Sequence, residues 1–134
     1  MAANMLVVED STDLHVLIQH ILAPLGQVTY VTSGEEARVL LSQNHFDLVL
    51  SDQELDGRVS GIDLYLTCRK QYPATAFLLI SGFPGNVFQK LISTGIECPP
   101  YVDKPFSSPQ LRNSVQRLLQ SFAAAASGQS SKAA

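Results

Sequence analysis

The sequence has 134 residues, 46% of them hydrophobic, which is enough chain to bury the core of one domain. Its formal net charge is −3 and it holds no run of Lys and Arg, which argues against direct binding to nucleic acid or to an anionic membrane. No apolar segment approaches the roughly 20 residues of a transmembrane helix, and the N-terminal segment MAANMLVVED lacks the basic region of a signal peptide. We expect a cytoplasmic protein.

The first predicted strand is Asn4–Val8, with the sequence NMLVV. The apolar residues after it recur at helical spacing and predict a helix that ends at Gly26. These residues are Leu14, Leu17, Ile18, Ile21, Leu22 and Leu25. Val28–Thr32 predicts the second strand. The S-x-x-E pattern that begins at Ser33 is a capping-box signature and predicts a second helix through about Gln43.

The third predicted strand, Leu48–Ser51, runs directly into Asp52. A helix from about Ile62 to Gln71 follows, then a strand over Ala76–Ser81 and a helix from about Asn86 to Thr94. The apolar runs LVL and AFLLI are typical of strands that are buried on both faces of a parallel sheet.

Tyr101–Val102 is a shorter, fifth strand candidate. The last helix is predicted to begin with Ser108 as its N-cap and Pro109 at its first position. Its core stripe is Leu111, Val115, Leu118, Leu119 and Phe122. We expect one domain over residues 1–122, followed by a disordered tail or linker stub over residues 123–134, because the sequence AAAASGQSSKAA has no apolar periodicity.

Five strands that alternate with five helices predict an α/β fold, a doubly wound parallel sheet covered on both faces. Functional groups gather beyond the carboxyl ends of the strands in such a sheet. Four of the five predicted strands deliver polar side chains to that edge. These are Glu9 and Asp10, Asp52, Ser81, and Asp103 with Lys104.

Two carboxylates about 4 Å apart repel by roughly 4 kcal/mol at an effective dielectric near 20, so three gathered acids require protonation, separation or a cation. Hard oxygen ligands suit Mg²⁺, which favours phosphate as a further ligand. The acids after the first strand disfavour a flavin or dinucleotide site, because they would repel its phosphates. With Lys104 as a fixed cation and Ser81 as a neutral donor, the set predicts phosphoryl transfer onto Asp52.

The cysteines and histidines give no second site. Cys68 and Cys98 form no CxxC pair, and we interpret them as thiols of a reducing compartment. His15 and His20 are off the i, i+4 spacing of a metal pair and His45 is isolated, so we interpret all three as surface or packing residues.

Four short motifs resemble one known family. VVEDS follows the first predicted strand, LVLSD ends the third, LLISG ends the fourth and YVDKPF contains the fifth. In this order and spacing they resemble the receiver domain of bacterial two-component response regulators, over about residues 4–122. The resemblance implies a flavodoxin-like sheet in the order 2-1-3-4-5.

The resemblance also implies the roles of the site residues. Asp52 would accept a phosphoryl group from a histidine kinase or phosphotransfer protein. Mg²⁺, or Mn²⁺ in its place, would be bound by the carboxylates of Asp10 and Asp52, by the backbone carbonyl of Glu54 and, through water, by Glu9. The chain would then be a signalling module with slow autodephosphorylation rather than an enzyme.

A switch is implied as well. Ser81 would move toward the phosphoryl group, Lys104 would pair with it, and Tyr101 would change rotamer. A downstream protein would read the face of the fourth helix, fifth strand and fifth helix. Phe83, together with Glu54, would influence the water that attacks the phosphoryl group, and the Lys104–Pro105 peptide would be cis.

The sequence departs from the family pattern in two loops. Asp56 stands where the family usually has proline, and Gly61 lies one place late, so we expect a longer loop in which the Asp56-Gly57 pair turns the chain. The segment GIECPPY, with Pro99 and Pro100, is also longer than usual. We expect altered loop geometry and an altered output face rather than lost chemistry.

Two other functions remain open. The fold could serve as an interaction module that is not phosphorylated, although every chemical residue is present. Asp52-x-Glu54 also faintly resembles the DxD pattern of aspartate-nucleophile phosphohydrolases of the haloacid dehalogenase type, although 134 residues leave no room for their usual cap domain.

Overall fold

The computed structural model describes residues 3–55, 57–82 and 84–133, without the side chains of residues 84, 86, 87, 90 and 124–133. Asp56 and Phe83, on which two of the expectations above depend, lie outside the described residues. Those two expectations stay predictions.

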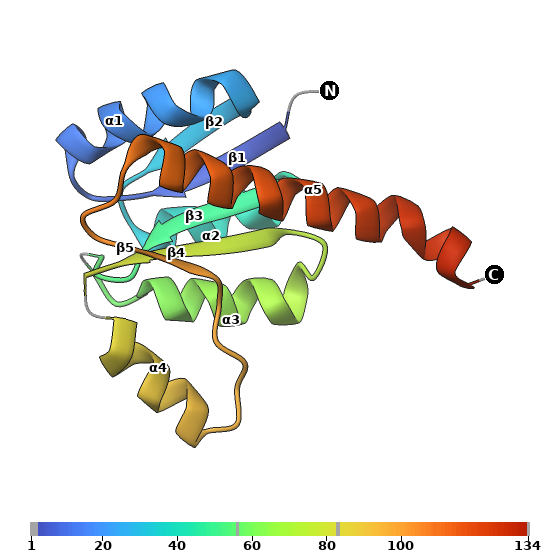
Figure 1. The fold of residues 1–134 in the computed structure, drawn as a ribbon. Helices are drawn as coiled ribbons and strands as arrows, with labels where there is room; N and C mark the ends of the chain where they lie inside the picture. The colour runs from blue at the N-terminus through green and yellow to red at the C-terminus, as the bar shows by residue number, and fades with distance from the viewer. Residues whose placement is uncertain (1–2, 56, 83, 134) are drawn as a thin grey trace.

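The chain forms one five-stranded parallel sheet in the order β2-β1-β3-β4-β5 (Figure 1). This confirms the predicted α/β fold, its flavodoxin-like strand order and its five helices. A short 3₁₀ helix precedes β2. In chain order the elements are β1 (Ala3–Val8), α1 (Thr12–Leu22), the 3₁₀ helix (Ala23–Leu25), β2 (Gly26–Val31), α2 (Gly34–Gln43), β3 (Leu48–Asp52), α3 (Gly61–Gln71), β4 (Ala76–Ser81), α4 (Pro84–Ser93), β5 (Tyr101–Asp103) and α5 (Ser108–Ala133).

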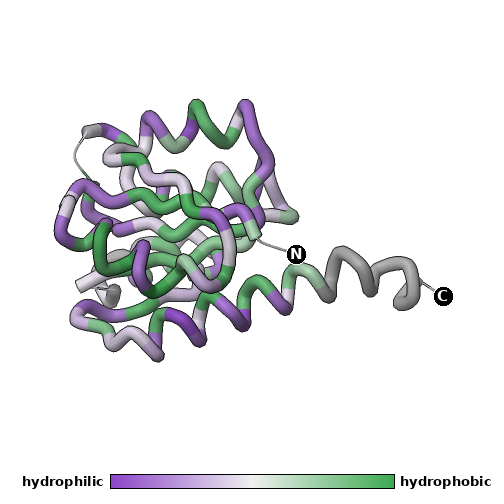
Figure 2. Tube along the Cα trace, turned by 90° about the horizontal axis from the view of Figure 1, so that it is seen from above, coloured by the Kyte–Doolittle hydropathy of each residue, from purple (hydrophilic) through white to green (hydrophobic). Residues whose placement is uncertain are grey.

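Side chains of the central strands point alternately to the two faces of the sheet, as the twofold period of a strand requires. In β1, Met5 and Val7 pack with α1 and α5, whereas Leu6 and Val8 pack with α2 and α3. The sheet is thus covered on both faces, and Figure 2 shows the hydrophobic residues concentrated along its strands. This sandwich explains why β1, β3 and β4 are nearly continuous apolar runs.

The strand register brings the carboxyl ends of the strands to one edge. Val8 pairs with Ser51, so Glu9 and Asp52 leave neighbouring strands at the same level. Asp52 pairs with Ile80 in β4, one residue before Ser81. Ser81 in turn pairs with Asp103, the residue before Lys104. The register therefore gathers the polar strand ends that the sequence singled out.

Two helix boundaries differ from the sequence prediction. The first α-helix ends at Leu22, because Pro24 allows only the 3₁₀ turn that precedes Gly26. At the start of α5, Ser107 is the capping residue in place of Ser108. Its hydroxyl accepts a hydrogen bond from the Gln110 N–H (3.2 Å), and its own N–H donates to the Gln110 side chain (3.4 Å).

Helix α5 also continues to Ala133, whereas the sequence pattern predicted its end near Phe122 and a disordered tail after it. The prediction relied on hydrophobic periodicity, which Ala123–Ala126 lack. Alanine has the highest helix propensity of all residues, so the helix can extend through Ala123–Ala126 without burying a face. The domain boundary at residue 122 stays a prediction.

The cysteines and histidines lie at packing or surface positions, as the sequence predicted. Cys68 is buried, Cys98 is half-buried, and both are free thiols. The His15 ring packs against Tyr30 with centroids 5.0 Å apart, and His20 and His45 are exposed. The Pro99–Pro100 segment joins the sheet through a hydrogen bond from the Leu79 N–H to the Pro100 carbonyl (3.0 Å).

Among the described helices, none combines the length and the apolar character that crossing a bilayer requires.

Candidate functional site

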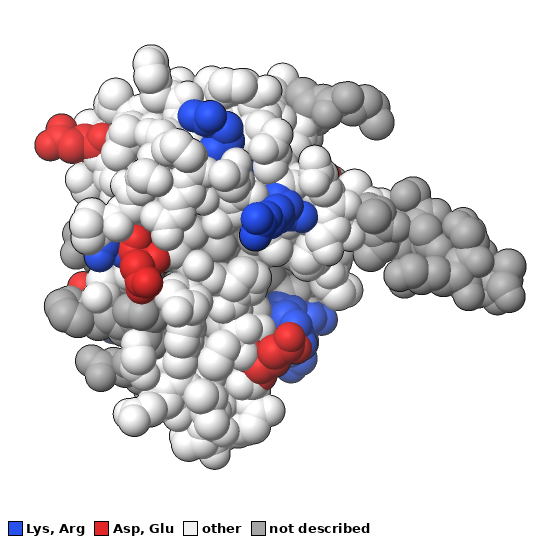
Figure 3. All heavy atoms as spheres, viewed as in Figure 1, with Lys and Arg blue, Asp and Glu red and all other residues white. Residues whose placement is uncertain are grey.

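A cleft of about 730 Å³ opens at the carboxyl edge of the sheet. Its walls come from the loop after β1, the first turns of α1, the loop after β3 and the residue after β5. Most of its polar lining is charged: Glu9, Asp10, Asp13, Asp52, Glu54 and Lys104. On the face that Figure 3 shows, the charges of the described residues lie singly or in mixed groups, without a broad patch of one sign.

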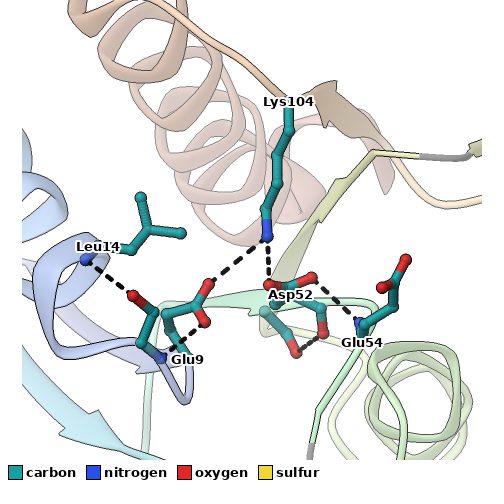
Figure 4. A network of polar contacts seen from close by, with 7 residues as sticks. Glu9, Leu14, Asp52, Glu54 and Lys104 are labelled. Carbon is teal, nitrogen blue, oxygen red and sulfur yellow. Dashed lines mark hydrogen bonds and ion pairs between the residues drawn. The ribbon is translucent and has the colours of Figure 1, made fainter.

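Asp52 is the last residue of β3 and is 4% exposed. Both of its carboxylate oxygens have a partner in the cleft. Oδ1 accepts a hydrogen bond from the Glu54 N–H (3.1 Å), and Oδ2 lies 2.5 Å from Nζ of Lys104. Figure 4 shows the Lys104 side chain reaching down between Glu9 and Asp52. The sheet and the loop after β3 thus hold this carboxylate in one orientation.

Glu9 is 1% exposed, which is unusual for a glutamate. Its Oε2 accepts a hydrogen bond from the Ser11 N–H (3.0 Å), while its Oε1 has no hydrogen-bond partner among the described residues and lies 3.9 Å from Nζ of Lys104. Burial raises the pKa of Glu9 to about 8, and the neighbouring Asp52 and Asp10 carboxyls add to the rise. Glu9 is therefore largely protonated at neutral pH unless a cation joins the cluster.

Lys104 follows β5, and its backbone N–H donates to the Ser81 carbonyl (3.0 Å). Its peptide bond to Pro105 is cis, which confirms the expectation. Burial alone would lower the pKa of Lys104, but the ion pair with Asp52 and the nearby Glu9 carboxylate outweigh it and raise the pKa above its ordinary value. Lys104 is thus a permanent cation at the centre of the acids.

The acidic residues could hold a divalent metal. Carboxylate oxygens of Glu9, Asp10 and Asp52 all lie within 4.8 Å of one another. The set supplies only hard oxygen ligands, the kind that Mg²⁺ and Mn²⁺ take in proteins. Oε1 of Glu9 is a further sign of fit, because it accepts no hydrogen bond among the described residues and its one cationic neighbour, Nζ of Lys104, lies 3.9 Å away. The Glu54 carboxylate lines the cleft but is not part of this three-acid cluster, so the cluster itself leaves only the Glu54 backbone as its predicted contribution.

The two residues predicted to form the switch lie outside this cleft's lining. Ser81 is buried at the end of β4 and is tied to the segment after β5 by its carbonyl. Tyr101 is 45% exposed, and its ring meets that of Phe88 in α4 edge to face, with centroids 4.7 Å apart. The structure therefore places Tyr101 on the outer surface, in contact with α4.

Sequence reasoning assigned Leu14 and Leu17 to the core stripe of α1, and for Leu17 this was wrong. Leu17 is 44% exposed, and both leucines line the cleft, as does Leu55. Their position in the chain could have indicated this. Residues in the first two turns of a helix that follows a strand lie at the carboxyl edge of the sheet, where that strand ends. The cleft thus has an apolar rim beside its acids.

The loop after β3 explains why Gly61 begins α3. A Cβ on Gly61 would lie 2.5 Å from the Asp52 carbonyl oxygen and 2.8 Å from the Gln53 Cα, so only glycine allows this close approach. Gly57 has φ of +99°, the left-handed region expected of the turn residue in this loop. Gly57 and Gly61 therefore allow the turn and the close approach in this loop, and Asp52 lines the cleft.

Comparison with known proteins agrees with this geometry. Residues 5–116 match the family described as response regulator receiver domain. The phosphate regulon transcriptional regulatory protein PhoB of Rhizobium meliloti (strain 1021) is 34% identical over 125 residues, which are 90% of this chain and 53% of that protein. The chain spans about half the length, or less, of the curated relatives it matches.

Solved structures show the same likeness. The response regulator receiver protein from Sinorhizobium medicae WSM419 has a TM-score of 0.78 and 28% identity, over 90% of this chain and 97% of that one. The BeF3-activated DrrB receiver domain has a TM-score of 0.76 and 26% identity, over 90% of this chain and 99% of that one.

Proposed function

The chain belongs to the response regulator receiver family, and we propose that Asp52 accepts a phosphoryl group from a histidine kinase or phosphotransfer protein. In this reaction an Asp52 carboxylate oxygen attacks phosphorus, the phosphorus–nitrogen bond of the donor phosphohistidine breaks, and the imidazole leaves. The product is an acyl phosphate on Asp52. The chain acts as a signalling module rather than as an enzyme that turns over a free substrate.

The observation that carries this proposal is the environment of the Asp52 carboxylate. It is buried, yet it lines an open cleft, and its two oxygens are oriented by the Glu54 N–H and by Lys104. A fixed nucleophile of this kind loses little freedom on the way to the transition state. Lys104 stabilises the charge that gathers on the phosphoryl oxygens, and its ion pair with Asp52 can pass to the phosphoryl group without a long movement.

A divalent metal fits the same cleft. We propose that the carboxylates of Asp10 and Asp52 and the backbone carbonyl of Glu54 hold Mg²⁺ or Mn²⁺, with Glu9 bound through water. When bound, such an ion neutralises the acids and stabilises charge on the transferring group. Such an ion would also favour the ionised form of Glu9, whose pKa is raised first by burial.

The alternatives have less support. A haloacid-dehalogenase-type mechanism requires a second acid as general acid–base, and the Glu54 side chain is exposed and outside the acid cluster of Glu9, Asp10 and Asp52. A module that is never phosphorylated would not need the buried Asp52–Lys104 pair at an open cleft, or a second buried acid, Glu9, beside it.

We also propose that the signal leaves through the face of α4, β5 and α5, to a downstream protein. The contact between Tyr101 of β5 and Phe88 of α4 is the feature that supports this face. A rotamer change at Tyr101 would remove an aromatic contact worth about 1 kcal/mol, which is enough to bias two arrangements of α4.

The experiment that tests the proposed chemistry is intact mass spectrometry after incubation with acetyl phosphate and Mg²⁺. One phosphate per chain is expected for the wild type and none for Asp52→Asn. Omission of the metal should abolish the label. Equal labelling of wild type and Asp52→Asn would exclude Asp52 as the acceptor.

A further inference from the structure

The loop between β3 and α3 carries Glu54 and Leu55, which line the cleft, so its position sets one wall of the site. Gln53 anchors the end of this loop next to β3. Its N–H donates to the Ile80 carbonyl (2.9 Å), and its side-chain oxygen accepts from the Ile62 N–H (2.9 Å). Val59 is buried in the core cluster on this side of the sheet, but Gly57 and Arg58 have no hydrogen bond to the sheet among the described residues.

The first turn of α2 supplies the missing contact. The Glu35 Oε2 accepts a hydrogen bond from the Arg58 N–H at 3.1 Å, across 23 residues of sequence. A Cβ on Gly57 would lie 2.9 Å from Oε2 and 3.0 Å from Oε1 of Glu35, so the carboxylate occupies the space beside this glycine. The turn at Gly57 and the Glu35 carboxylate therefore fit each other.

The neighbouring residue of α2 strengthens the same contact. A Cβ on Gly34 would lie 2.5 Å from Cγ1 and 2.6 Å from Cβ of Val59, so the start of α2 packs directly on the loop. Val59 is 5% exposed, which shows that this contact is tight. Two successive residues of α2 thus touch two parts of the loop, one by apolar packing and one by a charged hydrogen bond.

The chemistry of Glu35 suits a permanent acceptor. The hydrogen bond from the Arg58 N–H lowers the pKa of the Glu35 carboxyl, and further backbone hydrogen bonds within α2 and to Val59 add to this effect. The group is ionised at neutral pH and presents an acceptor to the loop. Hydrogen bonds to an ionised acceptor are roughly twice as strong as neutral ones.

We propose that Glu35 is a positioning residue for the phosphorylation site, which fixes the β3–α3 loop so that the Glu54 backbone faces the acid cluster. This inference rests on the proposed function of Asp52. Glu35 touches neither the metal nor the phosphoryl group. It acts through Gly57 and Arg58, and its loss should leave the chemistry of Asp52 intact while the metal site becomes less well ordered.

The variant Glu35→Ala tests the proposal, and Glu36→Ala is its matched control. Among the described residues the Glu36 carboxylate accepts hydrogen bonds from Thr32 and Ser33 and none from the loop, so this variant shows how much of the effect comes from a weakened start of α2 alone. Both variants change the net charge by one. Glu35→Gln keeps an acceptor but loses the charge, and it should fall between wild type and Glu35→Ala.

Two readouts are needed. Hydrogen exchange by NMR reports on the Arg58 N–H, and a Mg²⁺ titration followed at the Asp52 and Glu54 amides reports on the site. For Glu35→Ala we expect faster exchange and a Mg²⁺ dissociation constant about tenfold higher, the lower end of what loss of an outer-shell partner costs. The phosphorylation rate at saturating Mg²⁺ should stay within about twofold of wild type, since the nucleophile is unchanged.

Equal Mg²⁺ affinities of Glu35→Ala and Glu36→Ala would overturn the proposal, as would a loss of rate that saturating Mg²⁺ does not restore. Failure of the proposed function is distinguishable from both. If the wild type binds Mg²⁺ but is not phosphorylated, the proposed function fails, while the Mg²⁺ titration still decides the role of Glu35. If the wild type binds no Mg²⁺, the positioning role is overturned as well.

Discussion

Glu9 and Asp52 leave adjacent parallel strands at the same edge of the sheet, and their carboxylate oxygens lie within 4.8 Å of each other although both residues are buried. Such a pair is unfavourable unless a cation or a proton accompanies it. Lys104 supplies one positive charge beside both carboxyls, and the pKa of Glu9 is nevertheless raised, first by burial and then by the neighbouring Asp52 and Asp10. A divalent cation, as proposed above, would offset the repulsion that remains.

Mg²⁺ should therefore stabilise the folded protein. At a concentration 100 times its dissociation constant it should add about 2.7 kcal/mol to the free energy of unfolding, because it binds only the folded state. Asp10→Asn should reduce this gain, whereas Asp13→Asn, which also alters an acid of the cleft lining but not of the three-acid cluster, should keep it. Thermal unfolding with Mg²⁺ or EDTA measures both. An equal loss in the two variants would contradict the assigned metal site.

Lys104→Ala should destabilise the metal-free protein, because it leaves two buried carboxyls without their cation. A fully buried pair would cost about 3–5 kcal/mol when one partner is removed. The Lys104 side chain is 34% exposed, so we expect about 1–2 kcal/mol. Urea unfolding in EDTA gives the value, with Lys70→Ala, at an exposed position on α3, as the control. A change no larger than that of the control would show that the pair contributes nothing to stability.

The two thiols should differ in reactivity. Burial raises the pKa of Cys68 to about 12, so at pH 8 only about one Cys68 in ten thousand is the reactive thiolate. We expect one alkylated cysteine per folded chain at pH 8, at the half-buried Cys98, and two in denaturant. The same shift makes the free energy of unfolding depend on pH. The Cys68 thiol ionises near its ordinary pKa of 9.0 in the unfolded chain but only near a pKa of about 12 in the folded one, so its contribution to stability is lost as the pH rises above about 9. Rapid labelling of Cys68 in the folded protein would contradict the packing of α3.

Beryllium fluoride with Mg²⁺ should mimic the phosphorylated state. We expect NMR shifts at the cleft, at Ser81 and Tyr101, and from α4 to α5, because a group on Asp52 that attracts Ser81 would bias the Tyr101–Phe88 contact. Asp52→Asn with the same additives is the control. Shifts confined to the loops around Asp10 and Asp52 would show that the partner reads the phosphorylated edge itself.

Much of the fold and site follows from local sequence signals. Apolar strands such as Leu48–Asp52 and Ala76–Ser81 mark a buried parallel sheet, and the residue at the end of each strand must lie at the shared edge. Glu9, Asp52 and Lys104 could therefore be placed together from the sequence. Each of them directly follows a strand or ends one, and the carboxyl ends of parallel strands all lie at the same edge of the sheet.

Other features depend on contacts that no local pattern records. Glu35 reads as an ordinary first-turn acid of α2, and only the packing of Gly34 on Val59 brings it to the loop of Gly57. Leu17 follows the core spacing of a helix but lies where α1 overhangs the cleft. Both depend on how a helix is tilted against the sheet, which periodicity does not specify.

The position of the acyl phosphate tests the central claim most directly. Borohydride reduces an aspartyl phosphate to homoserine, so peptide mapping after acetyl phosphate, Mg²⁺ and borohydride reports the modified residue. If the buried Asp52 carboxylate is the phosphoacceptor, we expect homoserine at position 52. This product should form only with Mg²⁺ and should be absent when EDTA replaces the metal. Homoserine at position 10, or no homoserine in a protein that binds Mg²⁺, would contradict the assignment of Asp52 as the phosphoacceptor.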